Sequence, residues 1–316
     1  MLAPSLIIGI LLLVLVMLVL MTYSMPVSHN AQSNEEANKK MSDSKNYVYA
    51  AIVAVCVGML AGLYFLLKGT VWEGHLMEWM NIVVRLMHVT FGIAWIGASF
   101  YFVFLENALN RTDNVRDELA GNLWAVHGGG FYYLEKYKVA PKEIPKALHW
   151  FKYEAYFTWL TGFTLLFVVY YFNAAAQLVD KNVLDITSFQ GICIGLISLI
   201  IGWLLYDLLC KSPLMKNQNA FIIVGLAIVL GFAFFYTRVF AARAAYMHFG
   251  AMLGTLMAAN VFFVIIPAQK AMVHAAKNGI PLDPRLGKNA LQRSIHNNYF
   301  TMPVLFVMIS NHFPST

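Results

Sequence analysis

Cysteine is scarce in this chain, and its spacing excludes two kinds of site. Three cysteines occur in 316 residues, at Cys56, Cys193 and Cys210, and no C-x-x-C or C-x-x-C-H motif is present. Since a zinc ribbon and a covalently attached c-type haem both require closely spaced cysteines, the sequence encodes neither. Isolated cysteines in apolar segments usually pack as small apolar side chains.

Charged residues are also few, at 12% of the chain against 59% hydrophobic residues. This composition excludes a set of soluble domains and predicts an all-α, polytopic transmembrane helix bundle with the lipid bilayer as partner. The formal net charge of +6 suits a membrane protein with cationic cytoplasmic loops. No basic run is interleaved with aromatic residues, so nucleic acid is not an expected partner.

About eight apolar segments approach the roughly 20 residues that a helix needs to cross hydrocarbon. They lie near residues 3–23, 47–67, 80–106, 151–173, 187–209, 219–236, 240–266 and 298–313. The first is expected to be an uncleaved anchor helix, with an atypical signal peptide as the alternative. We divide the chain into an anchor and polar linker (1–46), an additional transmembrane helix (47–74) and a transmembrane domain (75–316).

Lysine and arginine in the short loops predict the orientation of the bundle. The connections 107–150 and 267–297 carry several of both, 210–218 carries two lysines, and all three share one side if every span crosses once. The positive-inside rule makes that side cytoplasmic and places the N-terminus outside. Lys68, Lys181, Arg238 and Arg243 fall on the outer side and oppose the assignment.

Three consecutive glycines follow His127 in the segment 119–148, between aromatic residues. This pattern predicts a cytoplasmic Gly-rich hairpin with a tight turn. The glycines would also let backbone N–H groups approach an anionic ligand. The alternative is a plain turn that leaves His127 in solvent.

The segment 78–105 carries ionisable residues inside an apolar span. Arg85, His88, Gly92, Trp95 and Ser99 follow one another at spacings of three or four, which places them on one helical face. Because charge is costly in hydrocarbon, such a face is a candidate for contact with a cofactor or a cavity. The alternative is that its polar groups bond only to neighbouring helices.

His88 and His248 are predicted at similar depths, about 12 Å from the outer ends of their helices. Two such histidines on different helices are candidates to ligate the iron of one b-type haem. Arg85 would then stabilise a haem propionate through charge-assisted hydrogen bonds. The alternative is that both histidines bond to backbone carbonyls.

A second group of candidates lies near the predicted cytoplasmic ends of the helices. His127, His149, Glu154 and His296 are predicted to do acid–base work, because histidine titrates near neutral pH. Nearby tryptophans and tyrosines would either stack on a planar substrate or form an interfacial belt. Asp207 and Asn260 lie near span ends and are expected to reach the membrane interface.

Five segments of the chain resemble the bacterial membrane-bound urate hydroxylase family, also described as the urate oxidase N-terminal domain family. They are WMNIVVRLMHVTFGIAWIGASFYFVFLENAL, LWAVHGGGFYYLEKYKVAP, HWFKYEAYFTWLTGF, MHFGAMLGTLMAANVFFVIIPAQ and QRSIHNNYFTMPVLFVMISNHFP, and together they cover roughly residues 78–314. The candidate histidines and Glu154 sit in these segments. Two features depart from the usual pattern: residues 1–74 precede its start, and the cytochrome c domain of many members does not follow SNHFP.

The resemblance implies a multi-pass oxidoreductase of the bacterial inner (cytoplasmic) membrane. It would convert urate to 5-hydroxyisourate and pass electrons to cytochrome c or another respiratory acceptor. Our mechanistic hypothesis has urate entering from the cytoplasmic face, a histidine accepting a proton, and electrons leaving through the haem. Two other classes stay open: a b-haem electron-transfer subunit without purine activity, and a cofactor-free transporter or assembly subunit. The resemblance favours the enzyme.

Overall fold

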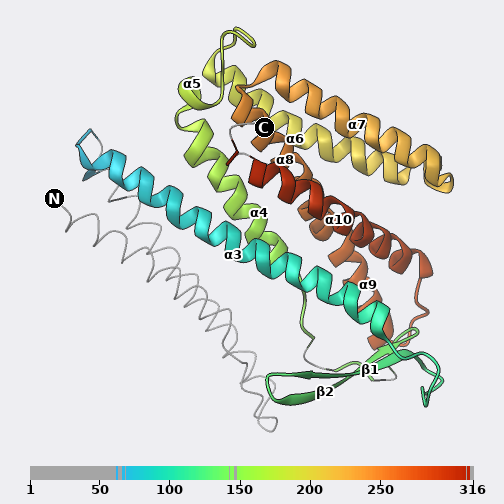
Figure 1. Cartoon of the computed structure of the whole chain (residues 1–316). Coiled ribbons are helices and arrows are strands. Elements are labelled where there is room, and N and C mark those ends of the chain that lie inside the picture. Colours follow the sequence, from blue (N-terminus) through green and yellow to red (C-terminus); the bar gives the residue numbers. More distant parts are fainter. Residues whose placement is uncertain are drawn as a thin grey trace. The chain divides into compact units, whose positions relative to one another are not determined.

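The computed structural model describes residues 62, 66–67, 69–141, 143–145, 148–310 and 312–313. The chain divides into two compact units, residues 1–87 and 88–316. Helix α3 (Trp72–Ala108) begins in the first unit and ends in the second. The other elements whose bounds the structure describes belong to the second unit (Figure 1): β1 (Leu119–His127), β2 (Gly130–Tyr137), α4 (Tyr153–Leu165), η1 (Leu166–Tyr171), α5 (Ala174–Gln177), α6 (Ser188–Lys211), η2 (Pro213–Lys216), α7 (Gln218–Val239), α8 (Ala242–Ala259), η3 (Asn260–Ile265), α9 (Ile266–Lys277) and α10 (Pro284–Ser310).

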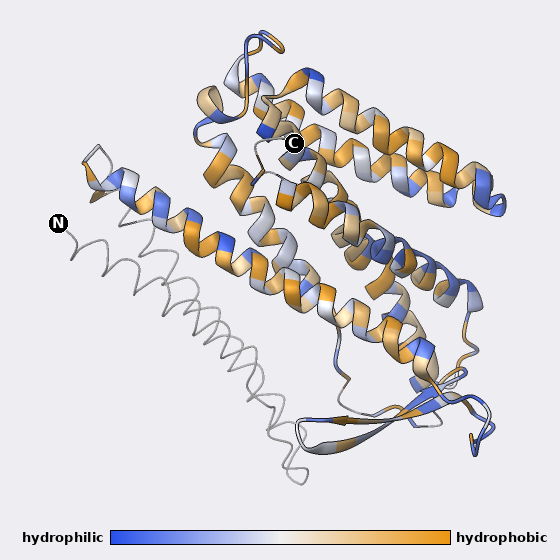
Figure 2. Cartoon of the chain, in the orientation of Figure 1, coloured by the Kyte–Doolittle hydropathy of each residue, from blue (hydrophilic) through white to orange (hydrophobic). Residues whose placement is uncertain are grey.

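Four helices in the described part of the chain are long and apolar enough to cross a membrane: α3, α6, α7 and the continuous helix α8–η3–α9. They correspond to the predicted spans 80–106, 187–209, 219–236 and 240–266, and Figure 2 shows the hydrophobic residues along their ribbons in orange. The segment 151–173 forms α4 and η1, but Glu154 and three threonines lower its apolar content. The span 3–23 lies outside the described residues, as does 47–67 except for residues 62, 66 and 67.

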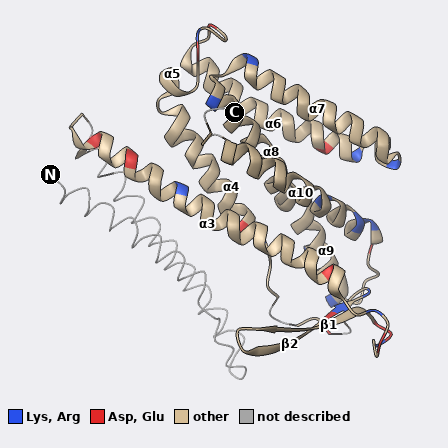
Figure 3. Cartoon of the chain, in the orientation of Figure 1, with Lys and Arg blue, Asp and Glu red and all other residues tan. Residues whose placement is uncertain are grey.

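Residues 298–310 of the predicted span 298–313 form the second half of α10, which begins at Pro284 and ends at Ser310. Its first half carries Arg285, Lys288 and Arg293, so it was mistaken for a loop. Asp283 caps the helix by accepting a hydrogen bond from the Arg285 backbone N–H at 2.9 Å. The Arg285 side chain also donates to this carboxylate and holds the pKa of Asp283 below its usual value. Figure 3 shows the positive charges along this half of the helix.

Strands β1 and β2 pair in antiparallel fashion, from Leu119 opposite Tyr137 to His127 opposite Gly130. The two-residue turn between them is Gly128–Gly129, with φ angles of 58° and 80°. Consecutive positive φ angles define the tight turn that matches strand twist, and glycine adopts them without strain. His127 therefore ends its strand beside the turn.

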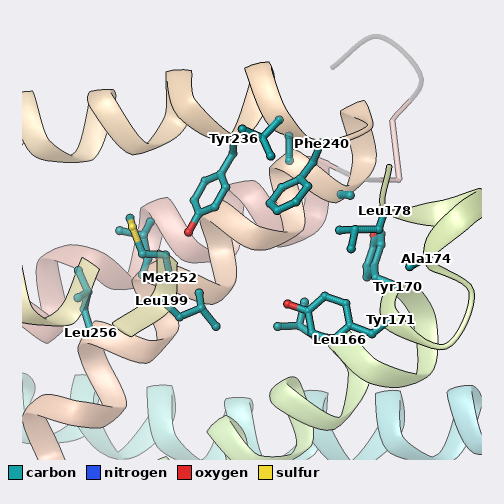
Figure 4. Packing of buried hydrophobic residues seen from close by; sticks show 14 of the residues in the cluster. Leu166, Tyr170, Tyr171, Ala174, Leu178, Leu199, Tyr236, Phe240, Met252 and Leu256 are labelled. Atoms are coloured by element: carbon teal, nitrogen blue, oxygen red, sulfur yellow. The ribbon is translucent and has the colours of Figure 1, made fainter. Parts of the chain in front are cut away.

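Helix α8 lies at the centre of the second unit, where it packs against α4, α6, α7 and α10. Its buried alanines and glycines allow these close approaches; a Cβ on Gly250, for instance, would lie 2.7 Å from the Met308 side chain on α10. The largest apolar cluster joins η1, α6, α7 and α8, with Tyr171, Tyr236 and Phe240 among its rings (Figure 4). This core fixes α8, and with it the two polar residues His248 and Asn260.

Candidate functional site

Six polar side chains from α6, η3 and α10 form one hydrogen-bonded group, here named the Arg293 cluster. Its members are Tyr206, Asp207, Asn260, Arg293, His296 and Asn297. Arg293 is only 4% exposed and Asn260 is completely buried. The Arg293 guanidinium donates to Asp207 Oδ1 at 2.7 Å and to Asn260 Oδ1 at 3.2 Å. A buried arginine with a carboxylate partner between apolar helices is costly, so its presence there marks a candidate site.

Arg293 fixes the orientation of the Asn260 amide. A guanidinium only donates, so Asn260 must turn its oxygen to Arg293 and its nitrogen to Tyr206, at 3.0 Å. The Tyr206 oxygen accepts there and also lies 2.9 Å from His296 Nδ1. A hydroxyl has one proton and two lone pairs, so it can either donate to that nitrogen or accept from it, depending on the His296 tautomer.

A second branch of the cluster ends on the backbone and agrees with this orientation. Asn260 Nδ2 also donates to Asn297 Oδ1 at 2.8 Å. The Asn297 nitrogen then donates to the carbonyl of Met257 at 3.1 Å, and a carbonyl can only accept. A donor at one end and an acceptor at the other thus fix both amide orientations.

Local helix geometry brings Asn260 to this position. Asn260 begins η3, a π-helical segment of six residues within the continuous helix α8–α9. Short π-helical segments occur frequently at functional sites. Aromatic rings surround the cluster: the guanidinium lies 4.9 Å from the Tyr206 ring centre and 5.8 Å from that of Trp203, and Phe221 stacks on His296 at 5.3 Å.

Sequence reasoning found only part of this cluster. His296 was a predicted site residue, whereas Asn260 was expected to reach the membrane interface and Arg293 was counted as a loop charge. Both expectations were wrong, because α10 begins early enough to carry Arg293 between helices and because the π-helical segment turns Asn260 inward. The spacing of four between Arg293 and Asn297 was the available signal, since it places both on one helical face.

His248 forms a second buried polar group, with Tyr171. Its side chain is completely buried, and Nδ1 lies 2.8 Å from the carbonyl of Ala244, so Nδ1 carries the proton. Nε2 accepts from the Tyr171 hydroxyl at 2.9 Å. A Cβ on Gly195 would lie 2.7 Å from that hydroxyl and 2.9 Å from Nε2, so α6 covers the hydrogen bond closely.

This packing does not fit a haem iron at His248. A ligating histidine must present a lone pair to the iron across an open space, but Nε2 is engaged by Tyr171. The Phe240 ring also lies 4.5 Å from the imidazole, centre to centre. Iron would have to displace the Tyr171 hydroxyl, so no step below passes through a haem.

The polar face of α3 beyond residue 87 is turned to α4. His88 Nδ1 donates to the carbonyl of Thr158 at 2.9 Å, and a Cβ on Gly162 would lie 2.7 Å from its ring. Trp95 packs against the small buried cluster of Ala155, Val261 and Ile266. The alternative in which His88 bonds to a neighbouring helix therefore describes the structure. Arg85 donates to Asn81 at 2.9 Å on its own helix.

The remaining predicted site residues are not gathered into one place by the described contacts. His149 Nε2 lies 3.8 Å from Glu154 Oε1; His149 is exposed and Glu154 is 6% exposed. Glu154 and Asn260 each directly precede a member of the Ala155–Val261–Ile266 cluster, so the start of α4 meets the start of η3. His127 is exposed at the hairpin turn.

Within the part of the chain that the structure describes, no group of three or more His, Cys, Asp or Glu side chains is placed to hold a metal ion.

An open cleft of about 740 Å³ lies between the α5 region, the first turn of α6 and Ala241, with Asp180, Lys181 and Asp185 among its lining residues.

Apolar helices that are long enough to cross a bilayer, with buried polar clusters between them, define a helical protein suited to a membrane and to a site in its interior. The chain belongs to the family described as urate oxidase N-terminal, whose model matches residues 74–316. This range includes the Arg293 cluster and all the predicted site residues. Neither the curated proteins nor the solved structures contain a match to the chain.

Proposed function

We propose that this protein is a membrane-bound urate hydroxylase that passes electrons to the respiratory chain. The family match over residues 74–316 carries the proposal, since it ties most of the chain to urate. The Arg293 cluster supports it, because a cation, two carboxamides and an imidazole beside aromatic rings suit a planar purine anion. An inner-membrane location fits the four apolar helices.

The reaction balances with one water and an external acceptor. Urate and water give 5-hydroxyisourate, two protons and two electrons, as a C5–O bond forms and the C4–C5 double bond is lost. A one-electron acceptor of the respiratory chain, with cytochrome c as the expected one, takes the electrons in two steps. Molecular oxygen is not consumed by the protein in this scheme, so no hydrogen peroxide is formed.

His149 is the proposed proton acceptor, with Glu154 as its partner. A carboxylate 3.8 Å from Nε2 stabilises an imidazolium once the proton has arrived. The exposed side chain of His149 can then release the proton to water, whereas Glu154 stays buried. His127, also exposed, is the second proposed acceptor.

The test uses the full chain in membranes, with urate and oxidised cytochrome c under anaerobic conditions. We expect urate loss, transient 5-hydroxyisourate absorbance and two reduced cytochromes per urate, and a rate that falls at least about 100-fold in His149→Ala. If urate is untouched while quinol or cytochrome c still reacts, the protein is an electron-transfer subunit. If urate crosses the membrane unchanged, it is a transporter.

A further inference from the structure

We infer that the Arg293 cluster binds an oxo-purine anion and that His296 acts there as a hydrogen-bond donor through Nε2, not as a base. This inference deepens the proposed function and takes its ligand, urate, from it. The direction of the hydrogen bonds in the cluster, its charge and its partly exposed imidazole carry the argument.

The charge of the cluster favours an anion. Asp207 is shared by two cations, since Arg293 Nη2 lies 2.7 Å from Oδ1 and Lys211 Nζ lies 2.6 Å from Oδ2. Arg293 is the buried cation of the two, with 5% of its side chain exposed against 69% for Lys211. One shared carboxylate leaves Arg293 incompletely neutralised in an apolar bundle, where a second anion would be strongly stabilised.

Arg293 also retains donors for a ligand. A guanidinium has five N–H groups in a planar fork. Hydrogen bonds to Asn260 and Asp207 use one N–H of Nη1 and one of Nη2 within the described residues. The remaining N–H groups match the edge of an oxo-purine, which presents carbonyl oxygens and ring nitrogens in one plane.

His296 is placed to meet a planar ligand. Its imidazole is only half-buried, and Phe221 stacks on it at 5.3 Å with an angle of 26° between the rings. Its Nδ1 lies 2.9 Å from the Tyr206 hydroxyl. In the inferred arrangement the hydroxyl donates to Nδ1, so Nε2 carries the proton and donates it to a carbonyl oxygen or an anionic ring nitrogen of the ligand.

This tautomer distinguishes a donor from a base. A general base must present an unprotonated nitrogen to the substrate. In the inferred tautomer the unprotonated nitrogen of His296 is Nδ1, and it is occupied by Tyr206. In glutamine the amide nitrogen reaches the position of Nε2, and in asparagine that of Nδ1. His296→Gln therefore keeps the donor that a ligand would use, whereas His296→Asn removes it.

The experiment measures urate affinity by equilibrium dialysis and KM by turnover, on the full chain in nanodiscs. We expect the Kd for urate to rise at least about tenfold in His296→Asn and Arg293→Lys, and to stay within about threefold of wild type in His296→Gln. Ser294→Ala, exposed on the same helix, is the matched control. Tyr206→Phe, which removes the proton donor to Nδ1, is expected to weaken binding to an intermediate degree.

Each other outcome decides between the two proposals. If His296→Gln and His296→Asn weaken urate binding equally, and both variants melt at the wild-type temperature, the donor assignment is overturned. Turnover of urate with no change of Kd or KM in any cluster variant would overturn the inference and leave the function standing. Binding with the expected pattern but without reduction of an acceptor would overturn the function and leave the binding site. No binding and no turnover would overturn both.

Discussion

Arg293 is linked to His296 through Asn260 and Tyr206, although the two side chains do not share a hydrogen bond in the described contacts. The guanidinium orients the Asn260 amide, the amide orients the Tyr206 hydroxyl, and the hydroxyl occupies His296 Nδ1. Buried networks in which every member is satisfied are rigid and sensitive to the loss of any one group. Changes at Arg293 are thus expected to reach His296 through hydrogen-bond direction.

The Tyr206 hydroxyl is expected to contribute to stability as well as to orientation. Tyr206→Phe leaves Asn260 and His296 each without a partner that they have in the wild type. Loss of a buried hydrogen bond that strands its partners costs about 1–3 kcal/mol. Thermal unfolding in detergent measures this. Tyr299→Phe is the control, since Tyr299 is 74% exposed on α10. Equal melting temperatures of the two variants would contradict a stabilising role of the Tyr206 hydroxyl.

The ion pair of Arg293 and Asp207 is expected to respond unequally to removal of its two members. Asp207→Asn strands a buried cation and should cost about 3–5 kcal/mol. Arg293→Met should cost less, because Asp207 keeps the exposed Lys211 at 2.6 Å. Lys211→Met is the control and should cost under about 1 kcal/mol. The free energies of unfolding of the three variants, together with a double-mutant cycle, test this order. A larger loss of stability in Arg293→Met than in Asp207→Asn would contradict it.

Gly195 is expected to tolerate no side chain. Gly195→Ala would place a methyl group 2.7 Å from the Tyr171 hydroxyl and 2.9 Å from His248 Nε2. Overpacking of this kind costs about 1–3 kcal/mol. Gly231→Ala on α7 is the matched control, because nothing lies within 4 Å of its Cβ position and alanine favours helix. If Gly195→Ala and Gly231→Ala have the same melting temperature, α6 does not pack closely against Tyr171 and His248 at this position.

His248 is expected to be replaceable without loss of any b-type haem band. Its Nε2 accepts from Tyr171, so it has no lone pair for iron in this packing. A reduced-minus-oxidised visible spectrum of wild type and His248→Gln tests this, with gel filtration as the measure of folding. Disappearance of an α-band in the folded variant alone would restore His248 as an iron ligand, with Tyr171 displaced.

The spans that sequence predicted best are those in which apolar runs are long and uninterrupted. Helices α6 and α7 match their predicted bounds to within three residues at each end, because hydropathy alone decides them. The start of α10 was missed, since its polar first half resembles a loop until it packs against α8 and α9. The hydropathy of the sequence does not indicate that tertiary packing buries Arg293.

The candidate site was predicted in its residue types and not in its geometry. Depth suggested that His88 and His248 would ligate one haem iron, but each bonds to a different part of the helical segment formed by α4 and η1: His88 to the carbonyl of Thr158 on α4, and His248 to Tyr171 of η1. Depth along a helix says nothing of the direction in which a side chain points. Tyr171 and Asn260 lie in the two π-helical segments η1 and η3, and no sequence pattern predicts such segments.

The one-way hydrogen bonding of the Arg293 cluster has a consequence for proton leakage. A chain of groups conducts protons only if, after each passage, every link can turn over and point the other way. A guanidinium that never accepts and a peptide carbonyl that never donates hold the amides of Asn260 and Asn297 in a single sense. The two amides of the cluster therefore do not relay protons, and this polar interior insulates.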